Sequence, residues 1–339
     1  MSESRSQPII GEAPVFLEML EHVSRAAPLS KPVLVIGERG TGKELIASRL
    51  HFLSQRWEQP LVKVNCAALT ESILESELFG HEAGAFTGAA KMHYGHFERA
   101  DEGTLVLDEL ATISLRMQEK ILRVIEYGEL QRVGGSATIN VNVRIVGSTN
   151  ADLRALVADG RFRDDLLDRL AFDVITVPPL RERTEDILPL AYAFAVAMVS
   201  ELKQSYFPGF TARASSMLLR HDWPGNVREL KNAIERSVYR TADLQQPIND
   251  IAFDPFDSPY RPREKSAAVK ASRKPAASAA PALLPANLEE AMAETERKLL
   301  QEALQKARFN QKVAADMLGL SYHQLRGRIR KHKLAAHSD

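Results

Sequence analysis

A glycine-rich segment near the start of the chain has the residue types and the spacing of a phosphate-binding loop. Residues Gly37–Lys43 fit the pattern G-x-x-x-x-G-K. Glycines at these places let backbone N–H groups wrap around phosphates, and the terminal lysine pairs with the β- and γ-phosphates. Composition alone produces this spacing in roughly one chain in ten, so an ordinary glycine turn is the alternative interpretation.

The residues on either side of this segment favour the phosphate interpretation. The apolar run Val33–Ile36 predicts a strand directly before it, and Lys43–Leu53 predicts a helix directly after it. The motif requires this strand–loop–helix order, because a helix N-terminus favours negative charge. The sequence departs from the common pattern at Glu44, where a Ser or Thr usually helps to hold Mg²⁺. The predicted nucleotide-binding loop consists of Gly37, Glu38, Arg39, Gly40, Thr41, Gly42, Lys43 and Glu44.

Two carboxylates end another apolar run. Thr104–Leu107 predicts a strand, and Asp108 and Glu109 follow it directly. Since the C-terminal ends of adjacent strands in a doubly wound sheet converge on the ligand, we expect both side chains near the glycine loop. Asp108 would then hold Mg²⁺ through water, and Glu109 could act as the general base on an attacking water. A solvated strand end is the common alternative for such a pair.

Three further polar residues fit the same chemistry. Asn150 follows the apolar run Val143–Val146, so it could sense the γ-phosphate at the same edge or merely start a turn. Arg163 and Arg169 lie six residues apart in a predicted helical segment. Single arginines on helices usually lie on solvated faces, but phosphoryl transfer benefits from an arginine supplied in trans, which a neighbouring subunit in a ring could provide.

Composition and length exclude several classes of protein. The 339 residues, 45% hydrophobic and 26% charged, have ordinary globular values and suggest about two or three domains. A single cysteine, Cys66, excludes an internal disulfide framework and a Cys-based zinc site, and fits a reducing compartment. The N-terminus lacks the apolar run of a signal peptide, and the apolar stretch Ile187–Ser200 is too short to span a bilayer. We therefore expect a cytoplasmic protein.

The elements that must position these residues divide the chain into four predicted parts. Short apolar runs alternate with helical patterns over residues 1–183, which predicts βαβ units around a parallel sheet. Helical periodicity alone follows over 184–256, as in a small helical subdomain. Residues 257–287 hold nine Ala, five Pro and four Ser in 31 positions, which is typical of a linker. Residues 288–339 form the last part.

The last part has the charge and pattern of a DNA-binding module. Residues 261–339 contain 16 Lys+Arg and 8 Asp+Glu, whereas residues 1–260 contain 28 and 36, so the basic end suggests a polyanionic partner. Leu288–Lys306 predicts an amphipathic helix, and Asn310–Lys333 predicts a helix-turn-helix, with Ser321 as the N-cap of its second helix. The predicted apolar faces comprise Met292, Leu299, Leu300, Leu304, Val313, Ala314, Leu318, Leu320, Leu325 and Ile329, and Gly319 marks the turn.

A basic second helix suits double-stranded DNA, because neutralised phosphates supply much of the affinity. Residues near its N-terminus are the candidates for base edges, and those near its C-terminus are candidates for phosphates. A solvated basic helix is the alternative. The predicted DNA contacts are Tyr322, His323, Gln324 and Arg326 for bases, and Arg330, Lys331 and Lys333 for phosphates.

The hexapeptide Gly84–Ala89, with the sequence GAFTGA, is the most specific motif of the chain. With it, the chain resembles the bacterial sigma-54-dependent transcription activators of the AAA+ ATPase superfamily over essentially its whole length. The other matching segments are Val64–Ala67, Glu77–Glu82, Gly103–Glu109, Phe162–Leu170, Pro178–Arg183 and Trp223–Leu230. The resemblance implies an α/β fold: an AAA+ P-loop ATPase with a parallel sheet and a small helical lid subdomain, then a linker and an all-α Fis-type helix-turn-helix.

The resemblance also implies roles for matching residues. ATP and Mg²⁺ are the expected cofactors, with Lys43 on the phosphates, Asp108 serving Mg²⁺ and Glu109 activating water. Asn65 is expected to contact Glu109 and restrain it, and Arg228 to report nucleotide state from the lid. Arg163 and Arg169 match arginines that act in trans in a homo-oligomeric ring, which we expect to be a hexamer. The implied sigma-54 contacts are Gly84, Ala85, Phe86, Thr87, Gly88 and Ala89.

The residues of this hexapeptide favour such a contact independently. Glycines on either side of its tip would let the loop swing, with Phe86 and Thr87 as an apolar and a hydroxyl contact. An ordinary turn with Phe86 in the core is the alternative. Within the family, the resemblance is to the phage shock activators, which the negative regulator PspA restrains in trans. Trp57, an aromatic residue in the polar stretch Ser54–Gln59, is the candidate regulator contact, or it covers a strand edge.

The resemblance thus implies an activator that binds enhancer DNA as a dimer and uses ATP hydrolysis to remodel sigma-54 RNA polymerase from closed to open complex. Another AAA+ remodeller, such as a helicase loader or an unfoldase, is the rival enzyme, and Gly84–Ala89 argues against it. A plain DNA-binding repressor with a structural nucleotide is the other rival, and the set Lys43, Asp108 and Glu109 argues against it. We expect no receiver domain, because the ATPase pattern begins within about ten residues of the N-terminus.

Overall fold

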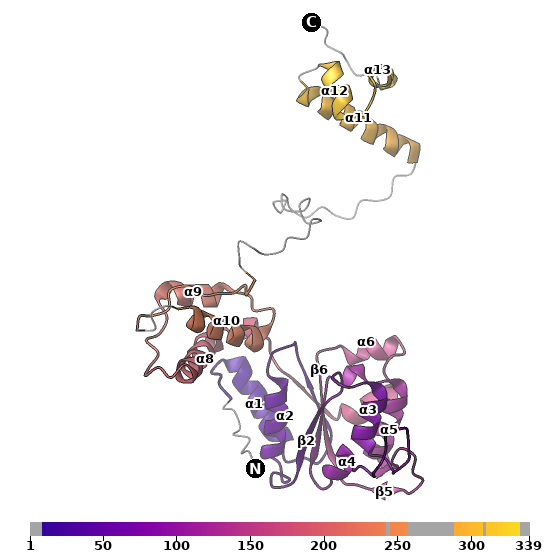
Figure 1. The fold of residues 1–339 in the computed structure, drawn as a ribbon, viewed down its shortest axis with the longest axis vertical. Coiled ribbons are helices and arrows are strands. Elements are labelled where there is room, and N and C mark those ends of the chain that lie inside the picture. The colour runs from indigo at the N-terminus through magenta and orange to yellow at the C-terminus, as the bar shows by residue number, and fades with distance from the viewer. Residues whose placement is uncertain (1–8, 242–244, 257–287, 308–309, 333–339) are drawn as a thin grey trace. The chain divides into compact units, whose positions relative to one another are not determined.

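The computed structural model describes residues 9–241, 245–256, 288–307 and 310–332 (Figure 1). The chain divides into two compact units, Met1–Arg261 and Pro262–Asp339. The predicted linker, residues 257–287, lies outside the described residues. In the described part of the chain, no helix is both long and apolar enough to cross a membrane.

The first unit is built on a five-stranded parallel sheet. Its strand order is β2-β3-β6-β1-β7. This sheet confirms the predicted α/β class, and its strands at residues 33–36 and 104–108 coincide within one residue of the predicted runs Val33–Ile36 and Thr104–Leu107. The strands are β1 (Val33–Ile36), β2 (Leu61–Asn65), β3 (Thr104–Asp108), β6 (Arg144–Thr149) and β7 (Asp173–Thr176).

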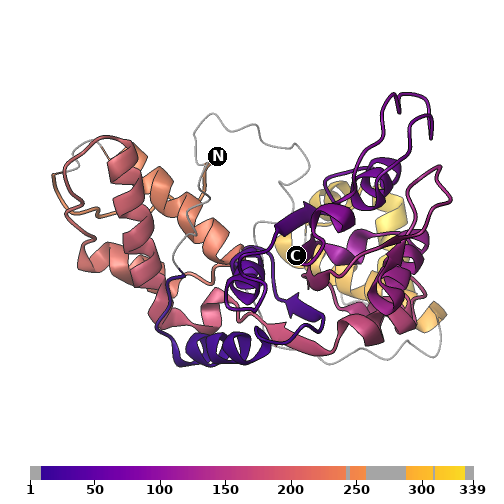
Figure 2. The ribbon, with the colours of Figure 1, turned by 90° about the horizontal axis from the view of Figure 1, so that it is seen from below.

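Helices cover both faces of this sheet (Figures 1 and 2). Alternate strand residues point to opposite sides, so Leu105 and Leu107 join one buried cluster while Val106 joins the other. Burial on both faces explains why the strands are continuous apolar runs. Helices α1 (Pro14–Ala26) and α2 (Lys43–Phe52) cover one face; α3 (Glu71–Phe79), α4 (His96–Arg99), α5 (Leu115–Tyr127) and α7 (Asp164–Leu170) cover the other.

Two excursions leave this body. One is the loop between α3 and α4, which carries Gly84–Ala89. The other is the antiparallel pair of β4 (Glu129–Leu130) and β5 (Ile139–Asn140). The remaining elements of the body are η1 (Leu110–Thr112), α6 (Leu153–Ala158), η2 (Leu180–Glu182) and η3 (Thr184–Asp186).

The predicted helical part of this unit consists of α8 (Ile187–Glu201), α9 (Ala212–Arg220) and α10 (Asn226–Arg240), which lie beside the sheet body (Figure 2). Its core surrounds the fully buried Trp223, whose indole Nε1 donates to the Leu218 carbonyl at 2.9 Å. Asp186, also fully buried, accepts hydrogen bonds from the backbone of Glu12 and Ala13. The segment that enters the helical part is thereby joined to the residues that precede α1.

The second unit contains α11 (Leu288–Lys306), α12 (Gln311–Met317) and α13 (Tyr322–Lys331). Gly319 has a φ of 64° in the turn, and Ser321 caps α13 by accepting from the Gln324 backbone N–H, as predicted. The buried cluster comprises Leu300, Ala303, Leu304, Ala307, Ala314, Ala315, Leu325 and Ile329.

The predicted apolar face is wrong at three positions in this unit. Met292, Leu299 and Val313 are 64%, 54% and 46% exposed. Adjacent residues on a helix lie about 100° apart, so only Leu300 of the pair Leu299–Leu300 can face the core. Three short helices bury a narrower stripe than the sequence pattern suggests.

Candidate functional site

The glycine loop joins β1 to α2, as its sequence predicts. Gly40 and Gly42 have φ values of 77° and 99°, conformations that glycine adopts without steric cost. Gly42 is the N-cap residue of α2, so the first helical turn follows the loop directly. The Lys43 ammonium donates to the carbonyls of Gly37 and Glu38 at 2.9 and 3.1 Å. Burial lowers the pKa of Lys43, and the nearby Glu109 and Asp108 charges oppose that shift.

The two predicted carboxylates lie at the same edge of the sheet as the loop. Asp108 ends β3 and accepts a short hydrogen bond from the Ser148 hydroxyl on β6. Glu109 follows with a φ of 54°, which for a residue other than glycine costs of order 1 kcal/mol or more. This left-handed turn directs the chain out of the strand, and strained backbone of this kind is enriched at functional sites.

Asn150 joins this group. With its amide oriented so that each atom meets a suitable partner, the nitrogen lies 3.0 Å from Glu109 Oε2 and the oxygen 3.1 Å from Arg39 Nε. Asn65, in contrast, is the register neighbour of Asp108 but uses its side-chain oxygen to accept from the Ala67 N–H at 2.9 Å. Among the described residues no hydrogen bond joins Asn65 to Glu109, so the implied restraint of Glu109 by Asn65 stays a prediction.

These carboxylates fit a magnesium ion held together with a nucleotide. In the described residues, no group of three or more His, Cys, Asp and Glu side chains could hold a metal by itself. Mg²⁺ commonly takes one or two protein carboxylates, with waters and phosphates supplying the remaining ligands. Asp108 provides such an oxygen near Lys43, and Glu109 adds a second negative charge.

The start of α10 also reaches the loop. The Arg228 backbone N–H donates to the Gly40 carbonyl at 3.3 Å, and the Arg228 charge acts on Lys43. Sequence reasoning missed two neighbours of the loop, Arg181 and Asn226, which both contact Glu38. The sequence Pro224-Gly225-Asn226 predicts a turn at the start of α10. It does not predict the contact of Asn226 with Glu38, because Glu38 is distant in the sequence.

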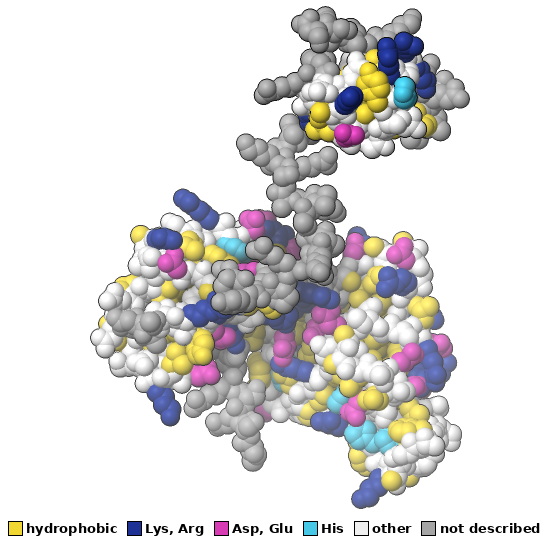
Figure 3. All heavy atoms as spheres, turned by 45° about the horizontal axis from the view of Figure 1, so that its top comes forward, with side chains coloured by type: hydrophobic (Ala, Val, Ile, Leu, Met, Phe, Trp, Pro, Cys, Tyr) yellow, Lys and Arg dark blue, Asp and Glu magenta, His cyan; other side chains and the backbone are white. Residues whose placement is uncertain are grey.

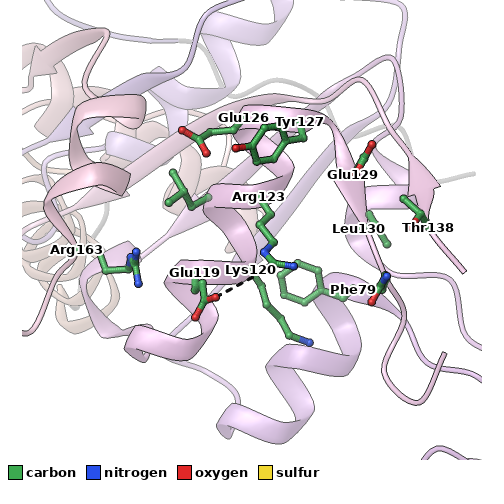
Figure 4. Close-up of a pocket in the computed structure, with 12 residues that line it drawn as sticks. Phe79, Glu119, Lys120, Arg123, Glu126, Tyr127, Glu129, Leu130, Thr138 and Arg163 are labelled. Carbon is green, nitrogen blue, oxygen red and sulfur yellow. Dashed lines mark ion pairs between the residues drawn. The ribbon is translucent and has the colours of Figure 1, made fainter. Parts of the chain in front are cut away.

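The two arginines predicted to act in trans are not part of this group. Arg163 forms an ion pair with Asp165 at 2.7 Å, and Arg169 forms one with Glu126 at 2.9 Å. Arg163 also lines a cavity of about 600 Å³ beside α5 (Figure 4). No residue of the glycine loop lines that cavity, whereas Glu126, the partner of Arg169, does.

The GAFTGA loop projects beyond the sheet body and is closed at its base. The Gly84 N–H donates to the Ala89 carbonyl at 2.8 Å, and Gly84 and Gly88 have φ values of 83° and 110°. Phe86 is 47% exposed, and its ring meets the His81 ring edge-on at 4.9 Å. Phe86 is therefore outside the core, as the contact interpretation requires.

The neighbouring β4–β5 excursion supports this loop. Arg132 donates to Glu82 at 2.8 Å and to Glu98 at 2.5 Å, so one guanidinium ties both ends of the loop segment. Elsewhere on the body, Trp57 is 57% exposed, and the preceding Arg56 donates to the carbonyl and the side-chain oxygen of Asn142 at 2.7 Å.

The predicted DNA contacts on α13 that the structure describes are exposed, as is Arg328. Figure 3 shows Lys and Arg side chains at the surface of this unit. Two of the predicted contacts, Gln324 and Lys331, form polar contacts within the chain. The Gln324 side-chain oxygen accepts from the Ser321 N–H at 2.9 Å, and Lys331 lies 3.7 Å from Glu296 on α11. Arg328 also pairs with Glu296, at 2.7 Å. Lys333 lies outside the described residues.

Comparison with known proteins gives the family. Residues 9–176 match the Sigma-54 interaction domain, residues 181–268 match the AAA+ ATPase lid domain, and residues 291–332 match the Fis family of bacterial regulatory proteins. The chain is 59% identical over 326 residues to the Psp operon transcriptional activator of Escherichia coli K12, covering 96% of this chain and 98% of that protein. This chain is a sigma-54-dependent transcriptional activator. The family confirms the resemblance that Gly84–Ala89 predicted.

Two further relatives agree with this membership. The Nif-specific regulatory protein of Azotobacter vinelandii is 44% identical over 322 residues, covering 95% of this chain and 58% of that protein. The crystal structure of NtrX from Brucella abortus in complex with ADP is 30% identical with a TM-score of 0.69, covering 98% of this chain and 71% of that chain. The AAA+ fold and the Fis-type helix-turn-helix are thus confirmed.

Proposed function

We propose that this activator hydrolyses ATP to remodel sigma-54 RNA polymerase from the closed to the open promoter complex while bound to enhancer DNA. The observation that carries the proposal is the convergence of Lys43, Asp108 and Glu109 at one edge of the sheet. A repressor with a structural nucleotide would need the lysine but not a carboxylate placed to activate water.

The phosphate loop and the residues around it have separate roles in hydrolysis. The backbone amides of Gly40–Lys43 hold the phosphates at the start of α2, and Lys43 pairs with the β- and γ-phosphates. Glu109 takes a proton from the attacking water, and Asn150 orients the Glu109 carboxylate. Asp108 would hold Mg²⁺, which when bound would supply positive charge against the charge developing on the phosphates.

Hydrolysis needs a second subunit in this proposal. Arg163 and Arg169 pair with carboxylates of their own chain that are not part of its glycine loop. In a homo-oligomeric ring, which we expect to be a hexamer, they would face the nucleotide of the next subunit and stabilise the charge of the transition state. Exchanging a surface ion pair for a phosphate contact costs little, because exposed pairs contribute about 0–1 kcal/mol.

The exposed residues of the GAFTGA loop and of α13, together with Trp57, are the proposed contacts with partners. Phe86 and Thr87 contact sigma-54, and α13 contacts the enhancer. The E. coli relative is named for the Psp operon, so we propose phage shock genes as targets, with PspA as the negative regulator acting through Trp57 in the cytoplasm.

Two measurements on the full-length protein test the proposal: steady-state ATP hydrolysis and co-sedimentation with purified sigma-54 in the presence of ATP. Hydrolysis together with sigma-54 binding supports the activator. Hydrolysis without sigma-54 binding would instead favour an AAA+ remodeller of another substrate, and no hydrolysis would favour the repressor.

A further inference from the structure

Four consecutive residues of the phosphate loop form hydrogen bonds with residues distant in the sequence. Their partners come from the segment that follows β7 and from the start of α10. The bonds join Glu38 to Arg181 and Asn226, the Arg39 carbonyl to Asn226, the Gly40 carbonyl to the Arg228 N–H, and the Thr41 carbonyl to Arg183. The loop is therefore held from outside as well as by its own strand and helix.

The pair of Glu38 and Arg181 has the geometry of a strong ionic contact. Arg181 Nη2 lies 2.6 Å from Glu38 Oε1, and Nη1 lies 2.9 Å from Oε2, so both carboxylate oxygens are engaged. Bidentate arginine–carboxylate pairs fix orientation as well as distance. The hydrogen bond from Arg181 lowers the pKa of Glu38 to about 2, so the carboxylate is ionised at neutral pH.

Asn226 connects this pair to the protein interior. Its side chain is fully buried, its oxygen accepts from the Leu180 N–H at 2.8 Å, and its nitrogen donates to Glu38 at 3.0 Å and to the Arg39 carbonyl at 3.1 Å. Its φ of 54° lies in the left-handed region that Asn tolerates better than most residues. One amide thus joins η2, α10 and the phosphate loop.

The backbones also touch at this place. A Cβ atom on Gly40 would lie 2.3 Å from the Gly225 carbonyl oxygen, so the loop and the turn before α10 are in direct contact. Arg228 follows three residues later. The loop backbone is therefore linked to the start of α10, where the Arg228 N–H donates to the Gly40 carbonyl.

We propose that Glu38 is a positioning residue that fastens the phosphate loop to the lid through Arg181 and Asn226, and is not itself a ligand of the nucleotide. The proposal rests on the proposed ATPase function. Glu38 holds the loop amides in their phosphate-binding orientation and keeps Arg228 beside the loop. Its loss weakens nucleotide binding more than the chemical step, because the water-activating group, Glu109, is held by Asn150 instead.

The test compares full-length Glu38→Ala, Arg181→Ala and the double variant with the wild type. A fluorescent ATP analogue gives Kd without requiring turnover, and steady-state hydrolysis gives KM and kcat. The matched control is Asp250→Ala, which breaks the exposed Arg213–Asp250 ion pair at 2.8 Å, a pair that does not involve the phosphate loop. Thermal melting of each variant reports whether the fold is intact.

We expect each single variant to raise Kd and KM up to about fivefold with kcat within about twofold of the wild type, as for a lost, partly exposed ion pair. The double variant should bind no more weakly than the weaker single variant, since both changes break one contact. Asp250→Ala should leave Kd unchanged. If Glu38→Ala does not fold, Glu38→Gln, which keeps one acceptor oxygen, should raise Kd about threefold.

Unchanged Kd in a folded Glu38 variant would overturn the inference, and so would independent, multiplicative effects of the two single changes. A fall in kcat with unchanged KM would also overturn it, because it would place Glu38 in the chemical step. A wild type that binds the analogue but hydrolyses no ATP would contradict the proposed function alone, and the Kd comparison would still test Glu38.

Discussion

The amide of Asn150 lies 3.0 Å from the Glu109 carboxylate, at the end of the strand next to the one that carries Glu109. Its oxygen faces Arg39 of the phosphate loop at 3.1 Å. One side chain therefore joins the proposed base to the loop that binds the phosphates. Because the amide both donates and accepts, it can serve both neighbours, which neither an alanine nor an ionised carboxylate can do.

Asn150→Ala should lower kcat for ATP hydrolysis about tenfold, with nucleotide affinity within about twofold, because Glu109 loses the donor that orients it. Asn150→Asp should lower kcat further, since a second carboxylate would repel Glu109. Steady-state kinetics and analogue binding measure both quantities. Equal losses of affinity and kcat in Asn150→Ala would show that Asn150 acts mainly on binding.

Thr87→Ala should abolish sigma-54 binding and leave at least about half of the ATP hydrolysis, because Thr87 is exposed on the GAFTGA loop and has no contact with the nucleotide site. Co-sedimentation and phosphate release measure the two activities. Thr184→Ala, another exposed threonine, is the matched control and should retain both. Loss of both activities in Thr87→Ala would contradict a dedicated contact loop.

Cys66 should be inert in the folded protein. The thiol is 4% exposed, and burial together with Asp108 and Glu109 raises its pKa to about 12 from a usual 9.0. A thiol reagent should label it at pH 8 only in denaturant. Because the folded-state pKa is the higher one, the stabilising contribution is present below pH 9 and is lost as the pH rises towards 12. Rapid labelling without denaturant would contradict this burial.

Arg326→Ala and Arg330→Ala should each weaken enhancer binding, whereas Arg328→Ala should have a smaller effect, because Glu296 already neutralises Arg328 at 2.7 Å. If Arg330 contacts phosphate, its removal should lower the salt slope of log K by about 1. Gel-shift titrations over a range of salt concentrations measure this. A loss for Arg328→Ala equal to the other two would show that DNA displaces Glu296.

The sequence predicts the parts of this site whose signal is local. The glycine loop, Asp108 and Glu109 each follow a buried strand, and adjacent parallel strands must bring them to one edge. The contacts of Glu38 could not be predicted, because Arg181 and Asn226 lie 143 and 188 residues away in the sequence. The orientation of Asn65 depends on its turn with Ala67, whose N–H donates to the Asn65 side-chain oxygen.

In the helix-turn-helix, too, the sequence predicts only the features that neighbouring residues determine. Its N-cap at Ser321 and its turn at Gly319 are set by neighbouring residues, and both are as predicted. The exposed Leu299 and Val313 are apolar residues whose burial depends on which partner helix lies beside them. A pattern of apolar residues alone contains no such information.

Promoter strand opening tests the central claim most directly. Full-length protein would be mixed with sigma-54 RNA polymerase on an enhancer-bearing sigma-54 promoter, and unpaired bases scored with ATP and with a non-hydrolysable analogue. Glu109→Ala, which should bind ATP but hydrolyse it about 10²–10⁴ times more slowly, is the matched variant. We predict opening by the wild type with ATP alone and none by Glu109→Ala. Opening with the analogue, or hydrolysis by the wild type without opening, would contradict the account.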